Sequence, residues 1–459
     1  MSNLFRAPAA ARGIKALDRS LFSRKVPTVA AAIRDRRHIA KYRQVLQASR
    51  DLFLLPRLNS IVAHPDPAVA ETGAKCIILK PEIDISQPTG YSPQLREATE
   101  KGEVELLPYE LDVGYDLWDY VDIMKSILPD TKEFEDIPSG FNTVGHVAHL
   151  NLREPFTEYK HIIAQVILDK NNAITTVINK VADVGAENEF RTFNYELLAG
   201  PDDLEVEVTQ LDCAFKFDYS KVYFNTKLSN EHERLVSKFG RGEVVADVMA
   251  GVGPFAVPAG KMGVFVWAND KNPESFDALK YAVKRNKVGE WVRASNDDGH
   301  DFIKTVSASV LEASRGGAKA RIDTPKPRRR DKGPPPEPSY VHVPPTISHF
   351  VMNLPASAIE FLHNFRGIYE GHEQLFEPRT GTRLPLVHVH CFATKADDDT
   401  PYAEITERLE RELGVAFTRG GTGDGVDVEI ILVRDVAPAK SMFCASFRLP
   451  AEIAFASSS

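Results

Sequence analysis

One stretch, residues 243–272, constrains the fold of this chain more than any other. It opens with an apolar run rich in valine, turns at two glycines and a proline, continues as a helix-like segment, and ends in a second apolar run closed by an acid. The residues that mark these features are Val244, Val245, Asp247, Val248, Gly251, Gly253, Pro254 and Asp270. Their order predicts a strand, a glycine-rich turn, a helix and a second strand.

The turn narrows the choice of ligand. Gly251 and Gly253 let the backbone approach a ligand without a Cβ clash, and Asp270 follows at about the spacing of a ribose-hydroxyl acceptor. The third glycine of a dinucleotide fingerprint is missing, and Pro254 has no N–H to offer a phosphate. The pattern is more similar to the D-x-x-x-G-x-G turn of class I S-adenosylmethionine (AdoMet) methyltransferases. Another nucleotide, or a purely structural turn, stays open at this point.

Composition sets the outer limits. With 459 residues, the chain has room for two to four domains, and 43% hydrophobic with 26% charged residues is typical of a soluble globular protein. No run of 18 apolar residues occurs, so we expect no membrane helix. The four cysteines form no C-x-x-C pair, which favours reduced thiols and neither a zinc site nor a disulfide framework. A net charge of −8 leaves only local patches for nucleic acid.

The first 50 residues are unlike the rest of the chain, with twelve Lys or Arg against the two acids Asp18 and Asp35. Residues 1–12 lack acids and are rich in Ala and Arg, which is typical of a mitochondrial presequence. A basic arm that touches RNA is the alternative, and the aromatic segment after Asp18 resembles folded protein.

Two features before the glycine turn are candidates for chemistry. Arg191 stands among aromatic residues, where it can make a cation–π contact at the edge of a core or clamp RNA. Asn230 and Glu233 resemble a capping box that would open a helix over residues 231–239. Glu231 would then lie in the first turn, either as a carboxylate beside the cofactor or merely stabilising the helix dipole.

The α/β pattern continues after residue 272. The acidic turn at Asp298 and Gly299 can accept from an adenine amino group or form an ordinary Asx turn. Residues 311–345 are rich in Gly, Pro, Lys and Arg, which predicts a disordered insertion. The next buried strand ends in Asn353-Leu354-Pro355, where an amide and carbonyl groups can accept hydrogen bonds from a planar base. Later strands complete one mainly parallel sheet with an antiparallel end.

The motifs together resemble the eukaryotic and archaeal tRNA (guanine-37-N1)-methyltransferase family. The specific segments are GHVAHLNLRE, NEFRTFNYELLAG, KVYFNTKLSNEHERLV, VADVMAGVGPFAVPA and MNLP, and the resemblance extends over nearly the whole chain. The insertion departs from the compact family pattern, and His300 stands where an Arg often follows Asp-Gly. A tRNA aminocarboxypropyl transferase, a non-catalytic RNA-binding protein and an NAD-type oxidoreductase are the alternatives.

The resemblance implies an α/β fold, with a Rossmann-like class I methyltransferase domain preceded by two smaller α+β domains. The expected ranges are residues 1–128 for a basic tRNA-docking domain, 129–213 for a middle domain and 214–459 for the catalytic domain. AdoMet is the implied methyl donor and tRNA the partner, contacted at its anticodon loop and body. We expect a monomer without membrane contact or metal, in the mitochondrial matrix, cytoplasm and nucleus.

The resemblance also implies residue roles. Glu231 is the expected general base for guanine N1, and Arg191 the expected cation that stabilises charge on O6. Tyr223, Asn353 and Pro355 are expected to hold the base. The residues expected to bind AdoMet are His232, Gly251, Gly253, Asp270, Lys271, Asn272, Asp298, Gly299 and Asn353.

Overall fold

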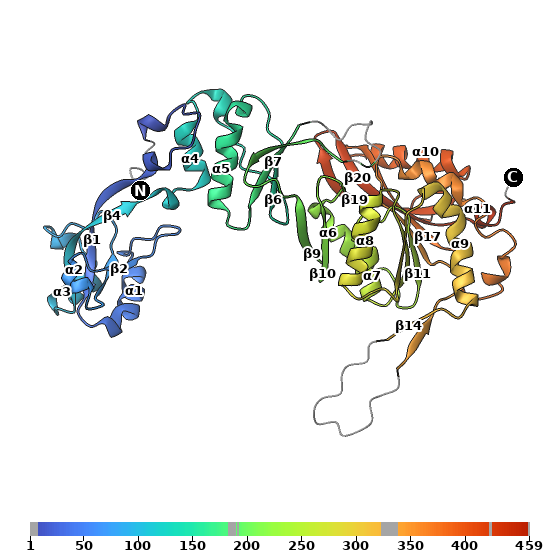
Figure 1. Cartoon of the computed structure of the whole chain (residues 1–459), viewed down its shortest axis with the longest axis horizontal. Helices are drawn as coiled ribbons and strands as arrows, with labels where there is room; N and C mark the ends of the chain where they lie inside the picture. Colours follow the sequence, from blue (N-terminus) through green and yellow to red (C-terminus); the bar gives the residue numbers. More distant parts are fainter. Residues whose placement is uncertain (1–7, 182–189, 191, 323–337, 422–424, 458–459) are drawn as a thin grey trace, which may run out of the picture. The chain divides into compact units, whose positions relative to one another are not determined.

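The structure is a computed structural model that describes residues 8–181, 190, 192–322, 338–421 and 425–457 (Figure 1). The chain divides into two compact units. The first comprises residues 1–142, 148–179 and 196–202, and the second comprises 143–147, 180–195 and 203–459. The division into three domains at residues 128 and 213 stays a prediction.

The first unit begins with an antiparallel four-stranded sheet in the order β2-β3-β1-β4. Its strands are β1 (Arg24–Ile33), β2 (Ile61–Ala63), β3 (Lys75–Ile78) and β4 (Val104–Val113). β1 pairs with β4 along its whole length, from Arg24 opposite Val113 to Ile33 opposite Val104. The accompanying helices are α1 (Ile39–Ala48), α2 (Pro67–Ala70) and α3 (Pro93–Glu100).

A second sheet follows in the order β5-β6-β7-β8, with the helices α4 (Tyr120–Ile127) and α5 (Lys160–Lys170) near it in sequence. Its strands are β5 (Asn142–Val144), β6 (Val147–Leu150), β7 (Thr176–Lys180) and β8 (Tyr195–Ala199). His146 lies in the turn between β5 and β6, and His149 lies in β6. The aromatic segment after Asp18 is folded, because Phe22 is buried in the core of this unit.

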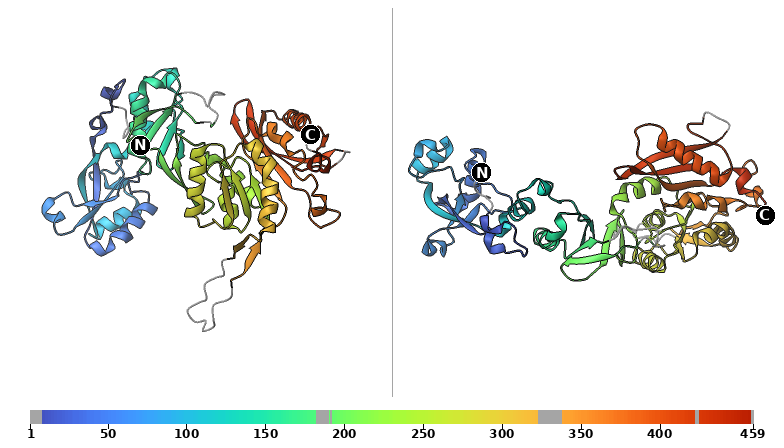
Figure 2. Two further views of the ribbon diagram at one scale, coloured as in Figure 1. Left: turned by 45° about the vertical axis from the view of Figure 1, so that its right-hand side comes forward. Right: turned by 90° about the horizontal axis from the view of Figure 1, so that it is seen from above.

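The second unit is built on an eight-stranded sheet in the order β13-β12-β11-β16-β17-β20-β19-β18 (Figure 2). The strands are β11 (Val244–Asp247), β12 (Phe265–Asn269), β13 (Val292–Ser295), β16 (His349–Met352), β17 (Leu386–Thr394), β18 (Phe417–Thr418), β19 (Val426–Ala437) and β20 (Lys440–Arg448). The pairs from β13 to β17 are parallel, whereas β20 is antiparallel to both β17 and β19. The predicted Rossmann-like sheet with an antiparallel end is therefore confirmed.

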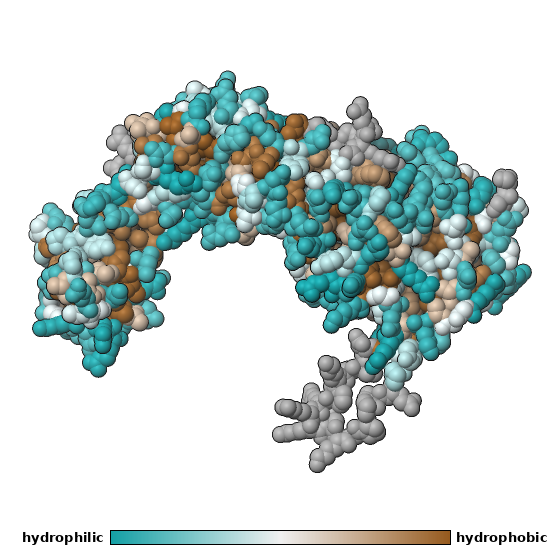
Figure 3. Space-filling model, viewed as in Figure 1, coloured by the Kyte–Doolittle hydropathy of each residue, from teal (hydrophilic) through white to brown (hydrophobic). Residues whose placement is uncertain are grey.

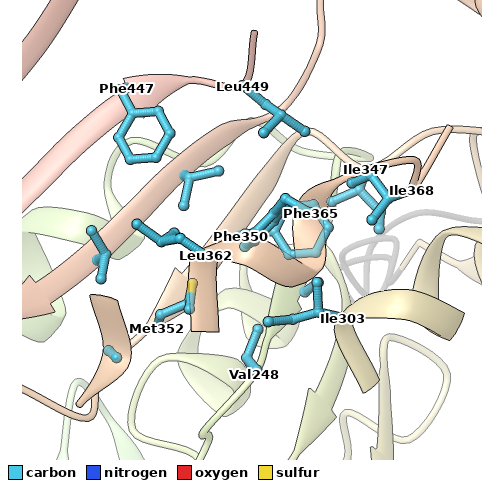
Figure 4. Packing of buried hydrophobic residues seen from close by; sticks show 14 of the residues in the cluster. Val248, Ile303, Ile347, Phe350, Met352, Leu362, Phe365, Ile368, Phe447 and Leu449 are labelled. Carbon is cyan, nitrogen blue, oxygen red and sulfur yellow. The ribbon is translucent and has the colours of Figure 1, made fainter. Parts of the chain in front are cut away.

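Helices and a hairpin complete this unit. The hairpin is β9 (Glu205–Gln210) and β10 (Cys213–Asp218), and the helices are α6 (Ser229–Val236), α7 (Ala256–Lys261), α8 (Pro273–Arg285), α9 (Gly299–Arg315), α10 (Thr400–Leu413) and α11 (Ala451–Ala454). The central strands are buried along their full length, as expected for a sheet covered on both faces. Figure 4 shows Phe350 and Met352 of β16 packed near Ile303 of α9 and Phe365 of the 3-10 helix η9 (Ala358–Phe365).

Two expectations about local structure were wrong. Helix α6 begins at Ser229 rather than at Glu231, and Asn230 does not cap it, because a 3-10 turn capped by Asn225 (Thr226–Leu228) leads directly into the helix. The ends of the predicted insertion are ordered. Helix α9 continues to Arg315, and β14 (Lys319–Arg321) pairs with β15 (Tyr340–His342). Arg328, Arg329 and Arg330 lie outside the described residues.

The surface agrees with the composition. Figure 3 shows mainly hydrophilic residues on the visible face of the second unit, with apolar residues scattered among them. Among the described residues, no helix is both long and apolar enough to cross a membrane. All four cysteines are buried free thiols.

Candidate active site

A cavity of about 330 Å³ opens where β11, β12 and β16 end. β11 lies between β12 on one side and β16 on the other, so chain order reverses there, at the position where open α/β sheets bind ligands. The residues that line this cavity are Phe190, Tyr223, Val248, Met249, Gly251, Asp270, Lys271, Asn272, Ser275, Asp298, Gly299, His300, Asn353, Leu354, Ser357 and Phe361.

The glycine turn forms the floor of the cavity. Gly251 and Gly253 have φ angles of 56° and 93°, which L side chains rarely adopt. A Cβ on Gly251 would meet no atom within 4 Å, whereas a Cβ on Gly253 would lie 2.6 Å from Leu279. Gly251 therefore presents bare backbone to the cavity, and Gly253, which does not line it, lets α8 pack close to the turn.

Asp270 ties the second strand to this turn. Its Oδ2 accepts from the Gly251 N–H at 2.7 Å and its Oδ1 from the Asn272 N–H at 3.0 Å. Asn272 in turn caps α8 by accepting from the Glu274 N–H. Burial raises the pKa of Asp270, although the two backbone hydrogen bonds oppose the rise. The carboxyl group is thus held at the edge of the cavity by the backbone on both sides.

Asp247 ends β11 behind the turn and is fully buried. Neither of its carboxyl oxygens has a hydrogen-bond partner among the described residues. Burial, reinforced by the nearby charge of Asp270, raises the pKa of Asp247 to about 8. At neutral pH the Asp247 carboxyl is therefore mostly protonated.

Lys271 and Asp298 face each other across one end of the cavity. The Lys271 Nζ lies 2.8 Å from the Asp298 Oδ2, and this bond lowers the pKa of Asp298. Asp298 also caps α9, accepting from the His300 N–H at 2.8 Å. Asp298 therefore forms the Asx turn that the sequence suggested, and it also lines the cavity.

His300 and Phe361 form a flat wall that the sequence did not reveal. Their rings stack with centroids 3.9 Å apart and planes 14° from parallel. Asn364 fixes the imidazole with a contact of 2.8 Å between its Nδ2 and the His300 Nδ1. Such a wall suits a planar ring, and its members come from separate elements.

A second cavity of about 60 Å³ adjoins the first. Tyr223, Met249, Gly251 and Asn353 line both cavities, so the two lie next to each other. The Tyr223 side chain is 48% exposed, which leaves its ring free to contact another molecule. The Asn353 Oδ1 is a buried acceptor without a hydrogen-bond partner among the described residues.

His232 lines the smaller cavity as a neutral ring. It is 2% exposed, and burial lowers its pKa to about 3. Its Nδ1 lies 2.9 Å from the Gln210 Nε2, and the Phe255 ring packs edge-on at 4.7 Å. Gln210, from the β9 strand, is a contact that the sequence did not suggest.

Glu231 lies one residue away but lines neither cavity. Its carboxylate accepts two hydrogen bonds from the Arg234 guanidinium, at 2.6 and 2.7 Å, and one from the His390 Nε2 at 2.7 Å. Burial opposes ionisation, yet the bonds from Arg234 and His390 lower the pKa of Glu231 to about 2. Glu231 is therefore a carboxylate throughout the neutral range.

Of the other expected site residues, one falls outside the described residues and one outside both cavities. Arg191 lies outside the described residues, although its neighbour Phe190 lines the larger cavity. Pro355 lines neither cavity, and its carbonyl accepts from the Phe392 N–H at 2.9 Å. Of the predicted cofactor residues, His232 lines only the smaller cavity. The remaining ones apart from Gly253 line the larger cavity, and Gly251 and Asn353 line both.

Comparisons with known proteins identify related chains. One family model, described as the TRM5/TYW2 methyltransferase domain, matches residues 207–325, and another, described as the TYW2 N-terminal domain, matches residues 120–203. A protein of Fusarium vanettenii named tRNA (guanine(37)-N(1))-methyltransferase is 59% identical over 454 residues, which covers 99% of this chain and 97% of that protein. Proteins of the same name from Neurospora crassa and Schizosaccharomyces pombe are 55% and 40% identical, covering 99% and 96% of this chain and 95% and 96% of those proteins.

Solved structures share the fold. Trm5b from Pyrococcus abyssi matches with a TM-score of 0.54 at 21% identity. The match covers 92% of this chain and 99% of the Trm5b chain. The structure described as the complex of aTrm5 and tRNALeu has a TM-score of 0.59 at 19% identity, covering 92% of this chain and 100% of its own.

Proposed function

This chain belongs to the tRNA (guanine(37)-N1)-methyltransferase family, and we propose that its two adjoining cavities hold S-adenosyl-L-methionine and guanosine 37 of a tRNA during methyl transfer. The product is 1-methylguanosine on the 3′ side of the anticodon. The observation that carries this assignment is Asn353, a residue that lines both cavities and whose buried Oδ1 has no hydrogen-bond partner among the described residues.

The larger cavity fits the methyl donor. Asp270 stands at the end of β12, where a carboxylate can accept from ribose hydroxyls. The stacked pair His300 and Phe361 offers an apolar wall for adenine, and Asp298 beside it can accept from the adenine amino group. When bound, the donor supplies an electrophilic methyl group on a sulfonium. The protein's part is to align the accepting nitrogen with that group.

The guanine belongs at the smaller cavity and its open rim. A nucleotide of the anticodon loop must leave its stack to be modified, and the exposed Tyr223 ring gives the extruded base a surface to stack on. The Asn353 Oδ1 can then accept from a guanine N–H. Adenine carries no N1–H and no 2-amino group, so the same acceptor selects guanine.

We assign proton transfer to Glu231 and charge stabilisation to Arg191. Guanine N1 becomes a nucleophile only as its proton leaves, and a carboxylate within reach can accept it. Negative charge then moves to O6, where one fixed donor lowers the barrier by roughly 3–4 kcal/mol. A carboxylate has about four acceptor directions, of which the bonds from Arg234 and His390 fill three, and the open one is on the Glu231 Oε2.

The direct test is methylation of tRNA transcripts by the purified protein with methyl-labelled AdoMet. Transcripts that carry G at position 37 should be labelled, and matched transcripts with A at position 37 should not. Donor labelled in its aminocarboxypropyl group should transfer nothing. The assignment is refuted if G37 and A37 transcripts are labelled equally, or if label is transferred from the aminocarboxypropyl group of the donor.

Replacement of Glu231 by Gln should slow methyl transfer by roughly 10²–10⁴-fold, the usual contribution of a general base. AdoMet affinity should stay within a few-fold, because Glu231 does not line the larger cavity. Single-turnover transfer and equilibrium binding measure the two effects separately. An equal loss of both would show that the carboxylate only supports the fold.

We further propose a monomer that serves mitochondrial, cytoplasmic and nuclear tRNA. Residues 8–12 are already part of the fold, since Ala11 is buried and the Arg12 guanidinium donates to the carbonyl of Lys125 at 2.8 Å. A deletion that tests for an import signal in this segment and leaves these contacts intact is therefore confined to residues 1–7. Fluorescent fusions with and without residues 1–7 should differ in their mitochondrial fraction, and native mass measurement tests the monomer.

A further inference from the structure

We infer that His390 is a positioning residue for methyl transfer, which fixes the Glu231 carboxylate relative to the strand that presents Asn353. The inference deepens the proposed role of Glu231 and rests on it. It concerns a histidine that is fully buried and lines neither cavity. Nothing in its local sequence marks it, because 159 positions separate it from Glu231.

Glu231 needs a partner outside its own helix. Arg234 lies one turn further along α6 and donates to both carboxylate oxygens, but it moves with that helix. Among the hydrogen bonds of the described residues, His390 makes the one that joins this carboxylate to another element. Because a buried carboxylate is costly unless it is hydrogen-bonded, the bond at 2.7 Å holds α6 against the sheet.

The sheet register carries this constraint to the substrate cavity. β16 and β17 are parallel neighbours, with Met352 opposite Val389. Asn353 directly follows the end of β16, and His390 is the next residue on β17. The Phe255 ring lies 5.9 Å from His390 and 4.7 Å from His232, so it fills the space between the two histidines. His390 therefore links the proposed base to the strand end that would hold the guanine.

The protonation of His390 suits this role. Burial alone lowers the pKa of an imidazole, but Cys444 and Glu231 beside it raise the pKa of His390 to about 10. The ring therefore keeps a proton on Nε2 at neutral pH and donates it to the Glu231 Oε1. This leaves the open acceptor direction on Oε2 unaffected.

The same cluster has the spacing of a metal site. Within the described part of the chain, Glu231, His390 and Cys444 bring one ligand atom each to within 4.8 Å of one another. The guanidinium of Arg234 already donates to both carboxylate oxygens, and its charge would repel a metal cation placed there. We therefore interpret Glu231, His390 and Cys444 as part of a charge-paired cluster and not as a metal site.

The test compares His390→Gln with His390→Asn. The glutamine amide nitrogen can occupy the place of Nε2 and still donate to Glu231, whereas the shorter asparagine cannot reach. Single-turnover methylation at saturating AdoMet and tRNA should be within about 5-fold of the wild type for H390Q. It should fall roughly 100-fold for H390N, within the range of general-base effects. AdoMet affinity should change less than about 3-fold in either variant.

His388 provides the matched control. It is equally buried two residues earlier on β17, but it contacts His349 and Ser446 instead of Glu231. H388Q and H388N should therefore methylate at similar rates. If H390Q is as slow as H390N, or if H388N is as slow as H390N, the positioning role is refuted.

A double-mutant cycle separates this inference from the proposed function. In the E231Q background, H390N should cost nothing further, because the group that it positions is gone. If E231Q methylates tRNA as fast as the wild type, Glu231 is not the general base. If E231Q methylates slowly but H390N methylates as fast as the wild type, the role of Glu231 as base stands and the positioning role of His390 is refuted. If the wild-type protein binds one equivalent of zinc and H390N does not, the cluster is a metal site and the positioning role of His390 is refuted.

Discussion

At the scale of single residues, the site is organised by buried acids whose charges differ. Asp247 is protonated behind the glycine turn, Asp270 is held by two backbone N–H groups, and Glu231 is ionised between Arg234 and His390. Each state follows from the partners of the carboxyl group.

The raised pKa of Asp247 predicts a pH-dependent stability. Between about pH 4 and 8 the folded protein holds a proton on Asp247 that the unfolded chain has lost, so its stability falls as the pH rises. Asp247→Asn removes this dependence. Its free energy of unfolding relative to the wild type should therefore rise by about 1.4 kcal/mol per pH unit in this range. Urea titrations from pH 5 to 8 without AdoMet measure it, and parallel curves for the two proteins would contradict it.

At the scale of elements, the strand–turn–helix unit sets the cavity floor, and its two glycines make different demands. Gly251→Ala should lose roughly 1–2 kcal/mol of stability, because its φ of 56° is strained for Ala but space is open around it. Gly253→Ala should lose roughly 1–3 kcal/mol more, because its Cβ would overlap Leu279. Urea unfolding ranks the two variants, and an equal loss in both would show that the packing of α8 against the turn is unimportant.

The elements also show how far sequence reasoning extends. The β11 turn and Asn353 could be located because apolar runs, glycines and strand-end polar residues lie close together in sequence. His390, Gln210 and the His300–Phe361 wall could not, because their roles come from packing between distant elements. The helix start at Ser229 was missed because a 3-10 turn precedes it. The β14–β15 hairpin was hidden by its Gly- and Lys-rich surroundings.

At the scale of the whole molecule, the basic N-terminal segment is less available to RNA than its composition suggests. Arg19 pairs with Asp169, Lys25 with Glu110 and Arg37 with Asp35. Further along the chain, Lys170 is also buried and donates to the carbonyl of Tyr115 at 2.7 Å. A count of basic residues therefore overstates the charge that can meet a phosphate backbone.

Arg34 and Arg36 are the better candidates, because both are exposed and neither forms an ion pair with another described residue. Replacing both by Ala should weaken tRNA binding and reduce the slope of log affinity against log salt by about one unit for each phosphate that is no longer neutralised. Lys25→Ala is the control, since Glu110 already neutralises its charge. Filter binding between 50 and 200 mM salt, in the range where such slopes are measured, gives both slopes. A larger effect of Lys25→Ala would contradict the proposal.

The β14–β15 hairpin gives this enzyme a natural attachment point. The Ile322 N–H donates to the Ser339 carbonyl at 2.9 Å, so the chain leaves the hairpin and returns to it at neighbouring positions. Because the free energy of closing a loop grows only slowly with its length, a reporter domain or a short turn can replace residues 323–337 at little cost to the sheet. A fluorophore placed there would be attached to the second unit through β14 and β15, and neither of these two strands lines either cavity.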